Sequence, residues 1–184
     1  MLEERIKVLD PKRYIVSKTD TKGIIEYGND YFVEVSGYQE SELIGKPHNI
    51  IRHPDMPKIV FKLMWDRIQS NQNIFAIVKN RAKDGQAYWV VTEFEAKFDK
   101  LSNKIVSYTA YRKAAPQKSI DAIVPIYAKL LEIEKESGME GSENYLRGFL
   151  EEQGKSYDEF VDELIGNKGL FAFFFKTMKK LFRK

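Results

Sequence analysis

The sequence predicts an α+β domain, with an antiparallel sheet that carries its helices on one side, followed by a helical extension. Two observations indicate this fold class. Two β-rich runs near the N-terminus and three more between residues 74 and 111 enclose a stretch with helical spacing. Short turn signals separate the paired runs, Asp20 to Gly23 in the first pair and Asp84-Gly85 in the second. Tight turns of this kind join antiparallel strands.

The N-terminal half is expected to form a hairpin and then three helical segments. Residues 14–27 form the hairpin, with a β-rich run on each side of its turn. Asn29 is placed to cap the short helix that follows. A helical turn at 41–45 closes on a glycine. Residues 58–72 carry an apolar stripe with the spacing of an amphipathic helix.

The C-terminal half is expected to add three strands and then helices. The strands cover the β-rich runs 74–78, 87–94 and 105–111. Helices are expected at 119–136, 142–153 and 156–165, the last opened by a capping box at Ser156. These elements divide the chain into an N-terminal cap (1–13), the α+β domain (14–113), a linker (114–118), a helical extension (119–168) and a basic amphipathic helix (169–184).

The composition restricts the classes of function. The chain has 184 residues, 43% of them hydrophobic and none of them cysteine, which excludes disulfides and thiolate metal sites and is typical of a cytoplasmic protein. Its N-terminus lacks the apolar segment of a signal peptide, and no apolar run approaches the ~20 residues of a membrane span. The net charge is +3, but residues 168–184 carry six basic residues and no acid, so the remainder carries −3. We therefore expect no nucleic acid partner.

The run from Pro47 to Pro57 is the most unusual segment. Both histidines of the protein, an arginine, an aspartate and three of the six prolines lie in this run. Proline fixes φ and removes a backbone donor, so the run is a poor strand. Buried charge is costly unless something pairs with it. We therefore expect this segment to form one wall of a ligand site.

Several motifs resemble the PAS domains of bacterial aerotaxis receptors. They are Asn29 to Tyr38, Glu42 to Asn49, Arg52 to Pro57, Met64-Trp65, Ile77 to Arg81, Asp84-Gly85 and Tyr88 to Val90. The resemblance spans about residues 14–113 and implies a PAS fold with a five-stranded sheet. It also implies a non-enzymatic, cytoplasmic sensor of redox state or respiratory energy that holds FAD noncovalently. Its partner would be a membrane-bound chemoreceptor or the signalling module of one.

The resemblance implies that eight residues bind the cofactor, and no metal site is predicted. The eight are Asn29, Arg52, His53, Asp55, Phe61, Trp65, Asn80 and Tyr88. The residue types suit this role. The guanidinium of Arg52 suits phosphates, and an amide such as that of Asn80 can pair with the pyrimidine edge of a flavin. Aromatic rings such as that of Trp65 can stack on its ring system.

Each of these residues also has a structural interpretation. Arg52 suits a surface ion pair, Asn29 and Asp55 suit helix caps, and the aromatic residues suit the core. His53 suits a packing role or an axial position on haem. A further difference lies at Ile74, where the aerotaxis family has a tryptophan. This difference predicts a looser pocket, a shifted potential or a different cofactor.

Residues 169–184 separate into an apolar arc and a basic arc on a helical wheel. Such a helix suits the inner-membrane surface, a partner protein, the domain itself or a second copy in a homodimer. Three functions remain open beside the FAD sensor. They are a cofactor-free PAS interaction module, a haem-based gas sensor acting through His53, and a flavin enzyme, which has no nicotinamide motif in its favour.

Overall fold

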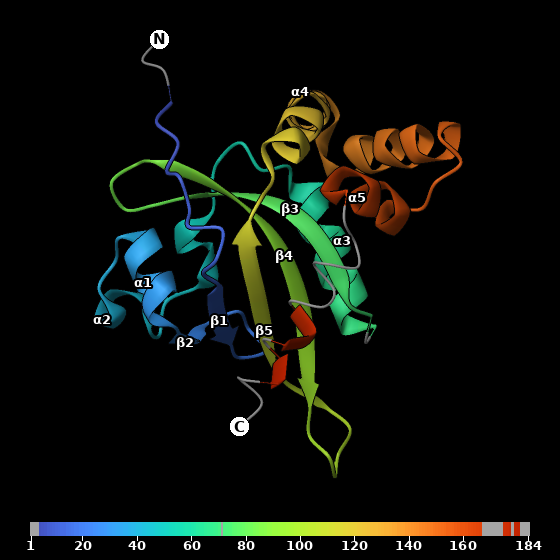
Figure 1. Ribbon diagram of the computed structural model, residues 1–184. Helices are drawn as coiled ribbons and strands as arrows, with labels where there is room; N and C mark the ends of the chain where they lie inside the picture. The colour runs from blue at the N-terminus through green and yellow to red at the C-terminus, as the bar shows by residue number, and fades with distance from the viewer. Residues whose placement is uncertain (1–3, 71, 167–174, 178, 181–184) are drawn as a thin grey trace.

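The computed structural model describes residues 4–70, 72–166, 175–177 and 179–180. Figure 1 shows a twisted sheet with α1 and α2 beside β1 and β2, and with α4 and α5 grouped at another end. The elements are β1 (Ile15–Thr19), β2 (Ile25–Gly28), α1 (Asp30–Ser36), α2 (Glu40–Leu43), the 3-10 turn η1 (His48–Ile51), α3 (Lys58–Gln69), β3 (Ile74–Arg81), β4 (Ala87–Phe98), β5 (Ile105–Ala114), α4 (Gln117–Glu152) and α5 (Tyr157–Ile165).

The five strands form one antiparallel sheet in the order β2-β1-β5-β4-β3. This arrangement confirms the predicted fold class. Because side chains alternate along a strand, the sheet has two faces with different surroundings. The cavity face carries Ser17, Asn80 and Arg112 and lies against α3. The outer face carries the alternate residues, among them Lys79 and Glu93.

The N-terminal half forms the hairpin and helices that the sequence predicts. The carboxylate of Asp20 accepts the amides of Lys22 (2.8 Å) and Ile24 (2.9 Å), which closes the hairpin turn. The side chain of Asn29 accepts the amide of Phe32 (3.1 Å) and caps α1. The amphipathic helix predicted from residue 58 is α3, and its apolar stripe is buried against the sheet.

The predicted linker, residues 114–118, is shorter in the structure. β5 continues through Ala114, and the amide of Ala115 still donates to the carbonyl oxygen of Trp89 (3.1 Å). Pro116 has no amide proton to continue the ladder, and α4 begins at Gln117. Only residues 115 and 116 separate the sheet from the helical extension.

The helical extension is more continuous than predicted. The helices expected at 119–136 and 142–153 are two parts of α4, which breaks at Gly138. Gly138 has φ 71° and ψ −172°, a conformation essentially confined to glycine. After this break the second part of α4 reaches α3, where Glu143 pairs with Lys62 (3.1 Å).

The extension shares one core with the sheet. The hydroxyl of Tyr127 on α4 donates to the carbonyl oxygen of Ile77 (2.7 Å), and its ring stacks on that of Trp89 with centroids 6.4 Å apart. At the start of α5, Asp158 pairs with Arg67 of α3 (2.7 Å). Buried residues of the sheet, α3, α4 and α5 belong to a single cluster. Among the described residues, no helix combines the length and the apolar character that a membrane crossing requires.

The predicted amphipathic helix, residues 169–184, lies largely outside the described residues. Its described part packs on the outer face of the sheet, in front of β4 and β5 in Figure 1. Phe175 is 1% exposed, and its ring centroid lies 5.6 Å from that of Phe75. The ammonium of Lys179 lies 2.6 Å from the carboxylate of Glu93. These contacts favour docking on the domain over the other interpretations of this segment.

Candidate functional site

A cavity of about 310 Å³ lies between the cavity face of the sheet, α3 and η1. Its volume is at the lower end of the range for small-molecule sites, ~300–1,000 Å³. Four of the eight predicted cofactor residues line it, namely Arg52, Phe61, Trp65 and Asn80. The run from Pro47 to Arg52 forms one wall, as predicted, whereas residues 53–57 lie outside the lining.

The helix α3 supplies the apolar wall. Phe61, Met64, Trp65 and Ile68 line the cavity at the i, i+3, i+4 and i+7 positions of one helical face. Trp65 is 38% exposed, and its ring makes an edge contact with that of Tyr108, with centroids 5.0 Å apart. A half-exposed tryptophan at the rim of an apolar wall is suited to stacking on a planar ligand.

Arg52 and Asn80 meet at one end of the cavity. Their backbones form an isolated antiparallel bridge, and the guanidinium of Arg52 lies 4.0 Å from the centre of the Phe61 ring. The side-chain amide nitrogen of Asn80 is buried and has no hydrogen-bond partner among the described residues. A buried donor without a partner costs stability. Asn80 is therefore available to donate to a ligand in the cavity.

His48 of the predicted wall forms a network with two lining residues that the sequence reasoning missed, Ser17 and Arg112. Ser17, His48 and Arg112 lie on β1, η1 and β5, and all three are buried or half-buried. Arg112 donates through Nη1 to the hydroxyl of Ser17 (2.9 Å) and through Nη2 to Nε2 of His48 (3.0 Å). The hydroxyl of Ser17 lies 2.9 Å from the same nitrogen. The ring of His48 also stacks on that of Phe32, with centroids 5.8 Å apart.

The donors of this network fix the charge of His48. A guanidinium only donates, so Nε2 of His48 must accept, and the ring is neutral with its proton on Nδ1. Burial lowers the pKa of His48 to about 3, and the charge of Arg112 acts in the same direction. His48 is therefore a neutral acceptor that orients Arg112.

The low pKa of His48 predicts a loss of stability in mild acid. Its folded-state pKa is below the ordinary value of 6.5, so the unfolded chain binds this proton first as the pH falls. The free energy of unfolding should then fall by about 1.4 kcal/mol per pH unit below ~6.5 from this group alone. We expect His48→Gln, whose amide oxygen can replace Nε2 as acceptor, to flatten this slope. Urea unfolding at a series of pH values measures it, and identical slopes would contradict the assignment.

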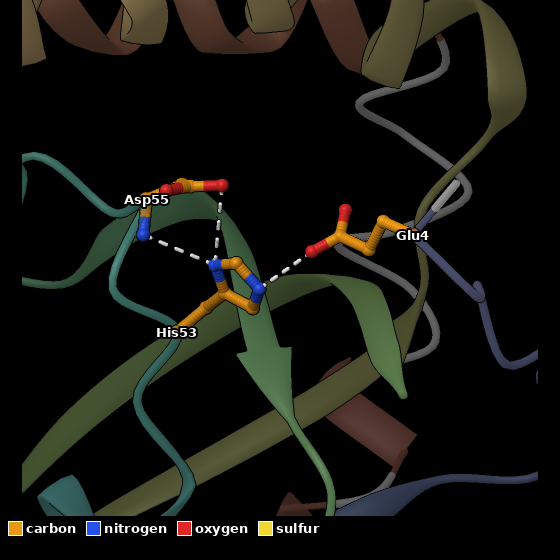
Figure 2. A group of neighbouring side chains, drawn as sticks. All are labelled: Glu4, His53 and Asp55. Carbon is orange, nitrogen blue, oxygen red and sulfur yellow. Dashed lines mark hydrogen bonds and ion pairs between the residues drawn. The ribbon is translucent and has the colours of Figure 1, made fainter. Parts of the chain in front are cut away.

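His53, one of the predicted cofactor residues, lies outside the cavity lining. Figure 2 shows its ring between Glu4 and Asp55. Nε2 lies 2.7 Å from the carboxylate of Glu4, and Nδ1 accepts the amide of Asp55 (3.0 Å). Burial and the Lys79 ammonium lower the pKa of His53. Both ring nitrogens are engaged, so neither is free to serve as an axial haem ligand in this conformation.

Asp55 also lies outside the lining, and it does not cap α3. Its side chain is exposed and lies 3.3 Å from the ammonium of Lys79, which is also 2.7 Å from Glu4. Glu134 of α4, a residue distant in sequence, instead accepts hydrogen bonds from the amides of Lys58 and Ile59 at the start of α3. Asp55 and Glu4 therefore both pair with the ammonium of Lys79. The ion pair between Glu4 and Lys79 holds the N-terminal segment against the sheet.

Two more predicted contacts, Asn29 and Tyr88, are absent from the lining. The amide of Asn29 is used structurally, because its oxygen accepts the amides of Val16 (3.0 Å) and Phe32 and its nitrogen donates to Tyr14 (2.8 Å). Tyr88 is on the cavity face but is fully buried, and burial raises the pKa of its hydroxyl. Ile74 is buried opposite Phe94, and the ring of Phe94 lines the cavity there.

Comparison with known proteins agrees with this geometry. Residues 25–110 match the family model described as PAS fold. The aerotaxis receptor of Escherichia coli (strain K12) is 41% identical over 116 residues, which are 63% of this chain and 22% of the receptor. The bacterioopsin transcriptional activator of Halobacterium salinarum is 25% identical over 85 residues, 46% of this chain and 13% of that protein. The chain thus spans about a fifth of the first relative and less of the second.

Solved structures show the same fold at low sequence identity. A light-oxygen-voltage domain from a study with a flavin analogue has a TM-score of 0.53 and 18% identity, covering 61% of this chain and 83% of that one. The light state of the blue-light photoreceptor Aureochrome1 LOV has a TM-score of 0.53 and 19% identity, covering 60% and 88%. At this identity the likeness concerns the fold alone.

Proposed function

This chain carries a PAS domain, and from that premise we propose that it is a sensor of redox state or respiratory energy that binds FAD noncovalently. The proposed partner is a separate membrane-bound chemoreceptor or its signalling module, and the proposed location is the cytoplasm near the inner membrane. The likeness to an aerotaxis receptor supports this proposal. The observation that carries it is the unpaired, buried amide of Asn80 in a cavity with an aromatic wall.

The lining residues fit a flavin in three respects. The α3 wall and Phe94 offer apolar and aromatic surface for a planar ring system. The amide of Asn80 offers a donor that has no partner among the described residues. Lys22, which is exposed, and Arg52, which is half-buried, add positive charge to the lining, which suits phosphates. When bound, FAD would supply a reversible change in ring charge and hydrogen-bonding pattern.

A short chain of contacts links the cavity to the helical extension. Asn80 is bridged through its backbone to Arg52, and the charge of Glu134 acts on the Arg52 guanidinium. Glu134 accepts the amides of Lys58 and Ile59, both at 2.9 Å, at the start of α3. A ligand can shift such an arrangement only through contacts that differ between two states. We propose that Asn80 makes the differing contact and that Glu134 carries the change into α4.

The first test is a visible absorption spectrum of the purified full chain, followed by identification of the released cofactor. Flavin bands with release of FAD would support the proposal. A haem Soret band would replace it with the gas-sensor alternative. A colourless protein that takes up no added FAD would leave an interaction module, and steady turnover with NADH would indicate a flavin enzyme.

We expect Asn80→Leu to weaken FAD binding about tenfold, which corresponds to one lost hydrogen bond of ~1–1.5 kcal/mol. The ligand-free variant should melt no lower than the wild type, because leucine removes an unpaired buried amide. Titration with FAD and thermal unfolding measure the two effects. Asn144→Leu, at an exposed position of α4, is the matched control and should change neither value. Unchanged affinity in Asn80→Leu would contradict the role of Asn80.

A further inference from the structure

Arg112 is the most deeply buried cation of the cavity. It lies on β5, where it is paired with Ile15 on one side and Thr92 on the other, and it is 2% exposed. Its two hydrogen-bond partners, Ser17 and His48, are neutral groups. No carboxylate in the described part of the chain forms an ion pair with it. Burial lowers the pKa of Arg112 to about 10, so it stays charged at neutral pH.

Arg112 has no carboxylate partner among the described residues, whereas Lys79, another buried cation of the same protein, has two. Lys79 is 7% exposed, and its ammonium is held by Glu4 (2.7 Å) and Asp55 (3.3 Å). A buried charge without a partner is strongly unfavourable. Arg112 faces a cavity instead of an acid. The missing negative charge is therefore expected to come from the ligand.

The cations of the cavity differ in how far they are exposed to solvent. Among the described lining residues three are cations, Lys22, Arg52 and Arg112, and none is acidic. Lys22 is exposed, Arg52 is half-buried and Arg112 is buried. The two more exposed cations suit the phosphates of a dinucleotide. The Arg112 guanidinium lies 6.0 Å from the ring centres of both Phe32 and Phe94, an aromatic environment that suits the ring system of the ligand.

We propose that Arg112 makes the cavity select the reduced, anionic form of the flavin ring over its oxidised, neutral form. This inference rests on the proposed binding of FAD. Uptake of two electrons from a reductant such as dithionite and of one proton would give the ring of bound FAD a net charge of −1, and the Arg112 guanidinium would stabilise that charge. A cation in a buried site stabilises such a charge more than water does. Arg112 thereby raises the reduction potential of the bound flavin.

The test is a potentiometric titration of the FAD-loaded full chain with dithionite at neutral pH. We expect Arg112→Gln to lower the midpoint potential by about 60 mV, which is a hundredfold loss of preference for the reduced form at ~30 mV per tenfold for two electrons. Arg112→Lys keeps the charge and should stay close to the wild type. Arg67→Gln is the matched control, because Arg67 pairs with Asp158 and is not a lining residue. The melting temperature of each ligand-free variant checks its fold.

The outcomes separate the two proposals. If the wild type and Arg112→Gln both hold FAD at the same potential, this inference is overturned while the FAD proposal stands. If the wild type takes up no FAD, both are overturned. If Arg112→Gln loses FAD, the midpoint potential of Arg112→Lys decides. A potential near the wild-type value supports the proposed role of the charge, and a large fall in potential overturns it.

Discussion

Removal of the Glu134 carboxylate by Glu134→Ala should destabilise the protein and loosen the start of α3. The carboxylate accepts the amides of Lys58 and Ile59, and it also accepts the hydroxyl of Ser142 (3.2 Å) in the second part of α4. Pro57, the residue before α3, provides no side-chain cap. Loss of a helix cap costs about 0.5–2 kcal/mol. We expect a loss of about 1–2 kcal/mol in the free energy of unfolding, measured with urea.

Hydrogen exchange gives this prediction a local measurement. The amides of residues 58 and 59 should exchange faster in Glu134→Ala, because their acceptor is gone. Glu134→Gln retains one acceptor oxygen and should fall between the alanine variant and the wild type. Glu140→Ala, on an exposed position of the same helix, should change stability by less than about 0.5 kcal/mol. Unaltered exchange at both amides in Glu134→Ala would remove Glu134 from the proposed signalling route.

The fold was predictable from the sequence because its signals are local. Alternating β-rich runs, the Asp20 turn and the Asn29 cap each act within a few residues, and all appear in the structure. The site was predictable only in part. Arg52 and Asn80 belong to motifs that resemble those of a known family, and both line the cavity. The last strand of the sheet, β5, was expected to end at residue 111. Arg112 therefore fell in a loop, although one more step of strand alternation places it on the face of Tyr108 and Ala110.

The contacts that sequence reasoning did not foresee depend on long-range partners. His53 and Asp55 were expected at the cofactor; in the structure they lie outside the cavity lining, where Glu4 contacts the ring of His53 and Lys79 contacts the carboxylate of Asp55. Asp55 was also expected to cap α3, but Glu134 occupies that role from α4, beyond the whole sheet in sequence. Competition between a local and a distant acceptor depends on how helices pack, and one sequence does not reveal that packing.

Phe175→Ala should release the C-terminal segment from the outer face of the sheet. Phe175 is buried against Phe75, and truncation of a buried phenylalanine costs ~3–5 kcal/mol when the structure cannot relax. Because its described part packs on the sheet without adding a strand to it, the segment can detach without unfolding the domain. We therefore expect the melting temperature of the domain to change little, and cleavage of the segment by subtilisin to become at least tenfold faster. Unchanged cleavage would contradict the docking observed here.

The ion pair of Lys179 provides the matched comparison. Its ammonium lies 2.6 Å from Glu93 and 3.7 Å from Glu95, and burial raises the pKa of Glu93 against the effect of this pairing. Lys179→Met leaves Glu93 buried without its ammonium partner, which is costly, so this variant should also release the segment. Lys176→Met removes an exposed lysine one turn away and should not.

Anionic vesicles separate docking from the membrane interpretation of residues 169–184. If the tail docks on the sheet, the wild type should bind vesicles weakly. Lys179→Met should then bind them at least as tightly as the wild type does, because release from the sheet exposes the apolar side chains of the tail. If the tail instead lies in the membrane surface, Phe175 is one of its lipid-facing residues. The wild type would then bind tightly, and Phe175→Ala would lose affinity. The sign of the change in vesicle binding on release therefore decides whether the outer face of the sheet or the lipid is the resting partner of this segment.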